Sequence, residues 1–155
     1  MAEAGTDRAR ADQTALLRAM LTGDESTHSR LAADLEARGA TDGLGVLVAA
    51  AFSVALRRHF RAGYTTADVI WLVAQIRAGN DEAATQIDPA GAEQLVLAAM
   101  GQPVSMDRVD DLTKGAIQAA GLAYLVGGHQ FSDDQLDAFL DDAQRQAGWL
   151  PHPRT

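Results

Sequence analysis

Apolar residues recur every three or four positions along most of the chain, and this spacing predicts amphipathic helices. No segment alternates between apolar and polar residues with period two, so no β-strand is expected. The helices are expected at 12–22, 24–38, 41–61, 65–78, 88–100 and 107–126, with a last one after Ser132. The predicted fold class is therefore all-α, a single-domain bundle of about seven helices with short loops.

Several expected helix starts carry capping residues. Thr65 or Thr66 can cap one helix, and Ser132 with Gln135 three residues later forms a capping box for the last helix. Asp88–Pro89 is a cap followed by a proline at the first helical position. These signals predict where three of the helices begin.

The segments outside the helical pattern are short. Residues 1–10 are small and polar and are expected to form a flexible N-terminal tail, and residues 151–155 a C-terminal tail. Residues 80–87 are polar and are expected to be a loop, while Trp149 and Leu150 are expected to fold back onto the helices. No repeat or linker interrupts the chain, so residues 11–150 are predicted to form one helical domain.

Apolar surface exceeds what one buried stripe per helix needs. In the helix expected at 41–61, Val46, Ala50 and Val54 add a second apolar side to a broad first stripe. Such a helix is buried on several sides or meets a second subunit. Further surplus apolar residues are Trp71, Leu97 and Met106. A contiguous exposed patch of this kind would mark a protein interface.

Charge and composition narrow the classes of partner. The formal net charge is −8, which disfavours nucleic-acid binding because such a surface repels phosphate. The longest apolar stretch, Leu44–Leu56, is too short to span a bilayer, and the first ten residues lack the apolar run of a signal peptide. A cytoplasmic protein without a membrane partner is expected.

The last helix carries a row of aspartates. Asp133, Asp137 and Asp141 recur every four residues, with Asp134 and Asp142 beside them. Like charges at this spacing destabilise a helix by a few tenths of a kcal/mol per pair, roughly. A basic partner or a divalent cation could compensate, but a solvated helix face is the favoured interpretation.

The basic counterpart lies at the end of the helix expected at 41–61. Arg57, Arg58 and Arg61 complement the helix dipole there, and with His59 and Tyr124 they could also line a small-molecule pocket between helices. A helix-turn-helix-like nucleic-acid binder over 44–79 is a further alternative, which the net charge disfavours.

Recognised catalytic patterns are missing. The chain has no cysteine, no phosphate-loop motif, no serine nucleophile elbow and no histidine pair at metal-binding spacing. We therefore predict no catalytic residue, no metal site and no cofactor.

Several apolar segments resemble those of uncharacterised all-helical hypothetical proteins from high-GC actinobacteria. The segments that carry this resemblance are 16–24, 49–52, 68–70, 87–89 and 136–140. The resemblance implies a bacterial helical protein and carries no activity or functional residue with it.

The expected function is a non-enzymatic protein-interaction or regulatory module. Its partner would be another protein or a second copy in a homodimer, with Trp71, the basic cluster and the aspartate row as candidate binding residues. The alternatives are a small-molecule binder or enzyme with a pocket near Arg57, His59 and Tyr124, and the helix-turn-helix-like reading.

Overall fold

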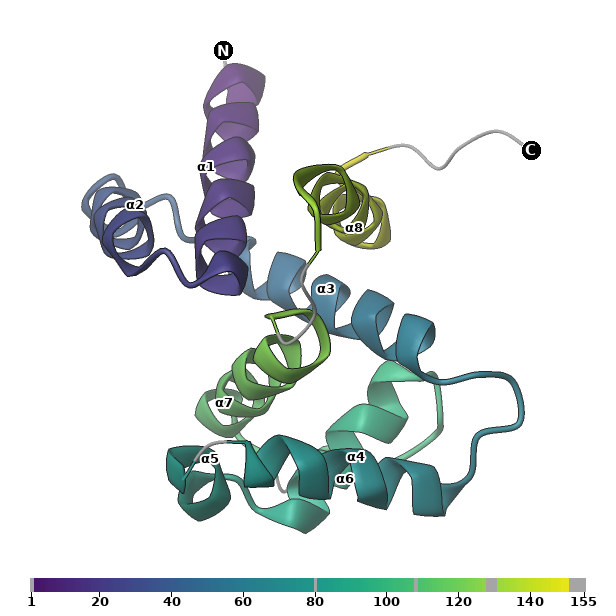
Figure 1. The fold of residues 1–155 in the computed structure, drawn as a ribbon. Helices are drawn as coiled ribbons and strands as arrows, with labels where there is room; N and C mark the ends of the chain where they lie inside the picture. The colour runs from purple at the N-terminus through teal and green to yellow at the C-terminus, as the bar shows by residue number, and fades with distance from the viewer. Residues whose placement is uncertain (1, 80, 108, 128–130, 151–155) are drawn as a thin grey trace. The chain divides into compact units, whose positions relative to one another are not determined.

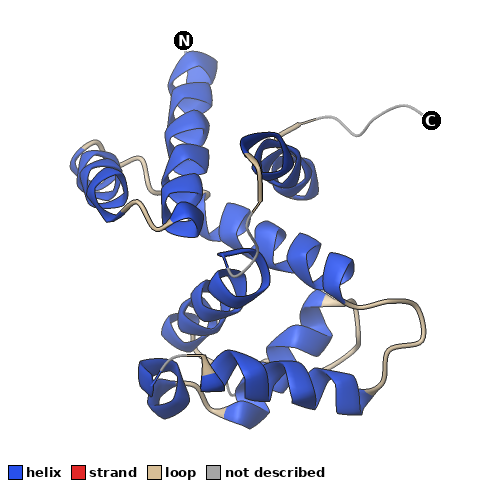
Figure 2. Cartoon of the chain, viewed as in Figure 1, coloured by secondary structure: helices blue, strands red, loops and turns tan. Residues whose placement is uncertain are grey.

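The computed structural model describes residues 2–79, 81–107, 109–127 and 131–150, and the all-α fold class is confirmed over these ranges (Figure 1). Helices and connecting loops make up this part of the chain, without a strand (Figure 2). The α-helices are α1 (Ala2–Thr22), α2 (Glu25–Ala37), α3 (Leu44–His59), α4 (Thr66–Ala78), α5 (Asp81–Gln86), α6 (Pro89–Ala99), α7 (Asp111–Leu122) and α8 (Asp133–Gln146). A short π-helix, η1 (Ala123–Gly127), follows α7.

The described residues group into two compact units. Unit 1 contains residues 2–51 and 131–150, which include α1, α2, the first half of α3 and α8. Unit 2 contains the described residues from 52 to 127, which include the rest of α3, α4 to α7 and η1. The domain boundaries expected from the sequence, with one domain over 11–150, stay a prediction. No helix in the described ranges is long and apolar enough to cross a membrane.

Helix α1 is longer than expected. It begins at Ala2, whereas the sequence predicted a helix only from Asp12 with a tail before it. The added turns contain Arg8, Ala9 and Arg10, residue types of high helix propensity, so a polar composition did not exclude a helix there. The expectation of an irregular segment at 2–10 was therefore wrong.

Unit 1 is held together by apolar faces that α1 shares with its neighbours. Figure 1 shows α2 alongside α1, and Leu17 and Leu35 are almost fully buried, with exposures of 2% and 0%. Helix α8 also packs against α1. Its buried face consists of the four residues that the spacing predicted, Leu136, Phe139, Leu140 and Ala143. A hydrogen bond of 3.0 Å from Gln144 Nε2 to Thr14 Oγ1 adds a polar contact between the two helices.

The structure confirms the three helix starts that the capping residues predicted. Thr65 and Asp68 form a complete capping box at α4, and Ser132 and Gln135 form another at α8. Asp88 accepts a hydrogen bond from the backbone N–H of Gly91 at 2.9 Å, which begins α6 at Pro89. Each cap satisfies backbone donors that a helix start leaves without an acceptor.

Unit 2 is built around the inner face of α4. The four residues of this face that the spacing predicted, Val69, Leu72, Val73 and Ile76, are all at most 4% exposed. Helix α4 packs against α5, α6 and α7. Close by in the same unit, Gly121 of α7 lies against the ring of Phe52, which is only 1% exposed. A side chain at position 121 would occupy the space of that ring.

Two features of unit 2 correct the sequence analysis. The segment 80–87 was expected to be a loop, but residues Asp81–Gln86 form α5. The helix expected from Asp107 begins at Asp111, because Asp110 accepts a hydrogen bond of 2.7 Å from the backbone N–H of Thr113 and caps it there. Its last four residues, 123–126, belong to the π-helix η1, which continues to Gly127, rather than to an α-helix.

The second apolar side of α3 is mostly buried. Ala50 and Val54 are 7% and 9% exposed, whereas Val46, nearer the start of the helix, is 54% exposed. The expectation that α3 is buried on several sides is therefore confirmed for most of its length. Of the other surplus residues, Leu97 and Met106 are half-buried and Trp71 is exposed.

Candidate functional site

The aspartate row on α8 faces solvent. Asp133, Asp137 and Asp141 are all exposed. Asp137 forms an ion pair with Arg18 of α1, so a cation of the same chain compensates one of the three charges. No group of three or more His, Asp or Glu side chains in the described ranges is arranged to hold a metal ion. The favoured interpretation, a solvated helix face, requires no external ligand.

The basic cluster lies at the end of α3 and is exposed. It consists of Arg57, Arg58, His59 and Arg61. Aromatic rings lie among these basic side chains. The ring of Phe60 contacts that of His59 edge to face, with 5.0 Å between the ring centroids, and stacks on the ring of Tyr64, with 5.1 Å between the centroids. The structure therefore brings these cations together in unit 2, where they follow one another along the chain.

Tyr124 belongs to the π-helix η1 and is 38% exposed. The predicted pocket near Arg57, His59 and Tyr124 stays a prediction, since none of the three lines either of the two hollows described below.

The outer face of α4 is apolar and exposed. We call it the α4 outer face, and its members are Ala67, Ile70, Trp71, Ala74 and Ala78. Trp71 is 68% exposed and Ile70 is 49% exposed. These residues recur at helical spacing on the side opposite the buried residues, so α4 is apolar on both sides. Trp71 is the sequence-predicted binding residue that this face includes.

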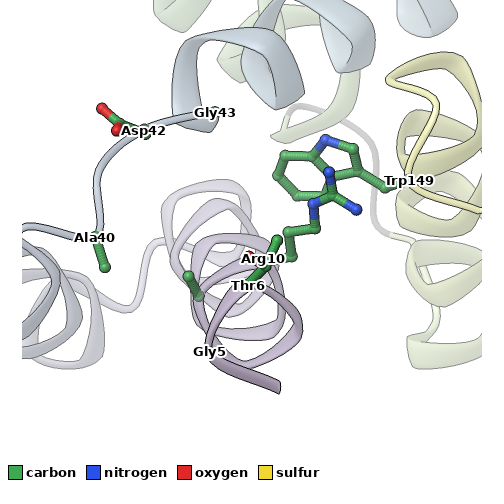
Figure 3. A pocket seen from close by; sticks show the side chains of 8 residues that line it. Gly5, Thr6, Arg10, Ala40, Asp42, Gly43 and Trp149 are labelled. Carbon is green, nitrogen blue, oxygen red and sulfur yellow. The ribbon is translucent and has the colours of Figure 1, made fainter. Parts of the chain in front are cut away.

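A hollow of about 420 Å³ lies within unit 1, between α1, the loop from α2 to α3, and Trp149 (Figure 3). Its lining residues are Gly5, Thr6, Ala9, Arg10, Ala40, Asp42, Gly43 and Trp149. The guanidinium of Arg10 lies over the indole of Trp149, 5.0 Å from the ring centroid. This volume is within the range of small-molecule sites.

The end of α8 places Trp149 at this hollow. The backbone N–H of Trp149 donates to the carbonyl of Gln144 at 2.8 Å, and that of Gly148 donates to the carbonyl of Arg145 at 3.0 Å. This pair of bonds is a Schellman motif, and Gly148 has the positive φ of 79° that the motif requires. The motif turns the chain back, which confirms that Trp149 folds onto the helices.

Gln13 connects α1 to the wall of the same hollow. Its side chain is fully buried, and Nε2 donates to the carbonyls of Ala40 and Asp42, both at 2.8 Å. Oε1 has no hydrogen-bond partner. The sequence analysis missed Gln13 and Arg10, because the residues they contact lie far along the chain.

A second hollow of about 330 Å³ lies at the turn between α1 and α2. It is lined by Ala19, Met20, Gly23, Glu25, His28 and Ser29. Its wall residues come from a single helical hairpin, and three of them, Glu25, His28 and Ser29, have polar side chains.

Among the residues that the structure describes, three ionisable groups have clearly shifted pKa values, and all three are cap residues of helices. Hydrogen bonds from the side chain and the backbone N–H of Thr27 lower the pKa of Asp24. Equivalent bonds from Thr113 lower the pKa of Asp110. The hydrogen bond to Asp12 raises the pKa of Arg38. None of the shifted groups lies in a hollow or on the α4 outer face.

No protein family model, curated protein or solved structure that was compared with the chain matches it. The proposals below therefore depend on the chain's own surfaces.

Proposed function

We propose that the chain is a non-enzymatic protein-interaction module that binds a second copy of itself through the α4 outer face. The observation that carries the proposal is the exposure of Trp71 and Ile70 among three alanines on one helix face. Tryptophan is among the residues most enriched in interface hot spots, and a contiguous apolar face in water favours association.

The pattern of large and small residues on α4 is self-complementary. Trp71 and Ala74 lie at equal distances from the point between Leu72 and Val73, next to the middle of the helix, and so do Ala67 and Ala78. In an antiparallel pair related by a two-fold axis, each Trp71 would therefore lie over Ala74 of the other copy. The alanines let the two helices approach closely enough for the indole rings to be buried.

Charges on α4 support the same arrangement. Asp68 lies near the start of the helix and Arg77 near its end, so antiparallel packing brings oppositely charged ends to the same level. The antiparallel helix dipoles also attract each other. Repulsion between copies is smaller here than elsewhere, because residues 52–127 carry eight acidic and six basic residues whereas the rest of the chain carries thirteen and seven.

The expected dimer is weak. Burial of Trp71 would remove roughly 150 Å² of apolar surface per copy, an upper contribution of about 4 kcal/mol at ~25 cal/mol per Å². One helix face is smaller than the standard interface of about 800 Å² per partner, so association in the micromolar range or weaker is expected.

Sedimentation equilibrium over a wide range of protein concentration tests the proposal. The wild type should show a reversible monomer–dimer equilibrium, which Trp71→Ser and Ala74→Glu should each shift to monomer. Leu112→Ser is the matched control, because Leu112 is an exposed apolar residue, 86% accessible, on α7 rather than on the α4 outer face. A wild type that stays monomeric at the highest concentration, or a dimer that Trp71→Ser leaves intact, would refute self-association through α4.

The chain has no cysteine, so single cysteines can report the orientation of the two helices. Oxidation of a mixture of Ala67→Cys and Ala78→Cys variants should give the mixed disulfide dimer. Each variant alone should remain uncrosslinked, because antiparallel packing separates identical positions at the helix ends. Crosslinking of each variant with itself would show parallel packing and would overturn the proposed arrangement.

A further inference from the structure

We propose that the hollow beside Trp149 binds a carboxylate that carries a neighbouring N–H group, as in an N-acylated amino acid or the C-terminal residue of a peptide. This site is independent of the α4 outer face. The proposal rests on two groups that line the hollow, Arg10 and the beginning of α3, and on Gln13, which is buried directly behind its wall.

Arg10 provides the carboxylate-binding group. No carboxylate of the described residues pairs with its guanidinium, which instead stacks on Trp149. Stacking on the indole fixes the plane of the guanidinium and leaves the N–H donors at its edge for a ligand. A carboxylate is the group that matches this planar set of donors.

The beginning of α3 favours the same charge. Gly43 lines the hollow immediately before Leu44, the first residue of the 16-residue helix, and no acidic residue lies in the first turn. The N-terminus of such a helix carries a partial positive charge that stabilises an anion. A cationic ligand would meet both this partial charge and Arg10.

Gln13 adds a requirement for a donor. Its buried Oε1 has no partner, and it lies 3.6 Å from the point that a Cβ on Gly43 would occupy, where the edge of Trp149 is 3.4 Å away. Leaving such an acceptor without a hydrogen bond costs about 1–3 kcal/mol. A ligand N–H that donates a hydrogen bond to Oε1 would remove this cost, whereas a simple anion would not. To reach Oε1, the ligand would displace the edge of Trp149.

Asp42 limits where the ligand carboxylate can lie. It is the acidic residue that lines the hollow, and Figure 3 shows its carboxylate on the opposite side from Arg10 and Trp149. The ligand carboxylate is therefore expected at the Arg10 side, with its N–H directed toward Gln13. Because Gly43 has no side chain, displacement of the edge of Trp149 is enough to open the way to Gln13.

Fluorescence of Trp149 in a Trp71→Phe background tests the site, since Trp149 is then the only tryptophan. Titration with N-acetylglycine should change the emission saturably. N-acetylglycine amide, which lacks the carboxylate, and N-acetylsarcosine, which lacks the N–H, should each bind at least about tenfold more weakly. A tripeptide with a C-terminal glycine distinguishes the two possible sources of the ligand. If the site takes a peptide terminus, the tripeptide should bind more tightly than N-acetylglycine. If the site takes a small free acid, N-acetylglycine should bind as tightly as the tripeptide or more tightly.

Two arginine variants check that the signal comes from this hollow. Arg10→Met should weaken N-acetylglycine at least about tenfold, because it removes the carboxylate-binding group. Arg8→Met is the matched control, an exposed arginine on the same helix that does not line the hollow, and it should leave binding unchanged. No saturable change with N-acetylglycine, or binding of N-acetylsarcosine or propionate as tight as that of N-acetylglycine, would overturn the proposal.

Discussion

Gly121 is a position where adding one methyl group should destabilise the protein. A Cβ at this position would lie 2.6 Å from Cε1 of Phe52, a residue that is 1% exposed. Carbon atoms pack at about 3.5–4.0 Å, so the ring or α7 would have to shift by about 1 Å. Such overpacking typically costs about 1–3 kcal/mol, and the better helix propensity of alanine returns about 1 kcal/mol. Gly121→Ala should therefore destabilise the protein by up to about 2 kcal/mol.

The same helix offers a control for this prediction. A Cβ on Gly115, an exposed glycine of α7, meets no atom within 4 Å, so Gly115→Ala should stabilise the protein by up to about 1 kcal/mol. Thermal unfolding should separate the two variants by roughly 5–10 °C for a chain of this size. Gly121→Ala should become neutral or stabilising in a Phe52→Leu background, where the ring is gone. If Gly121→Ala and Gly115→Ala stabilise equally in the wild type, the close packing of Phe52 on α7 is refuted.

Three further predictions concern unit 1. Because hydrogen bonds from Thr27 lower the pKa of Asp24, its ionised form stabilises the fold at pH values above the ordinary pKa of an aspartate, and this contribution is lost as the pH falls through the lowered pKa of the folded state. Urea unfolding between about pH 6 and about pH 3 should show the wild type losing stability relative to Asp24→Asn, and parallel profiles would contradict this. Asp137→Asn should cost less than about 1 kcal/mol, because the ion pair with Arg18 is 60% exposed on the aspartate side; a larger loss would show that the pair is desolvated. Phe139→Ala should cost about 3–5 kcal/mol in the same assay, because the ring is fully buried in α8, and a cost under about 1 kcal/mol would contradict that packing.

The parts of the fold that depend on neighbouring residues were predictable from the sequence. The buried face of α4 follows from the spacing of Val69, Leu72, Val73 and Ile76, and the capping box at Ser132 acts over three residues. Both features follow from local geometry that every α-helix shares. The expected loop at 80–87 was wrong because a polar composition also suits a short helix such as α5.

The candidate site could be predicted only in part. Trp71 was found because α4 has more apolar residues than one buried stripe requires. Apolar residues can be counted from the sequence alone. The pair of Arg10 and Trp149 and the bonds from Gln13 to Ala40 and Asp42 join residues distant along the chain. No periodicity encodes such contacts, since they depend on how a loop and two helices pack. The π-helix η1 was also missed, because nothing in the residue types of Ala123–Gly127 distinguishes it from another turn of α-helix.

The composition of unit 1 from the two ends of the chain has a consequence for the order of folding during synthesis. Residues 52–127 are contiguous, so everything that unit 2 requires is synthesised before α8. Unit 1 cannot be completed until α8 has been synthesised, because the hydrogen bond between Thr14 and Gln144 joins residues 130 positions apart. Until α8 emerges, the apolar side of α1 that receives it has no cover and is open to chaperones or to neighbouring nascent chains. A premature stop before residue 131 would thus leave a continuous unit 2 attached to an unfinished unit 1.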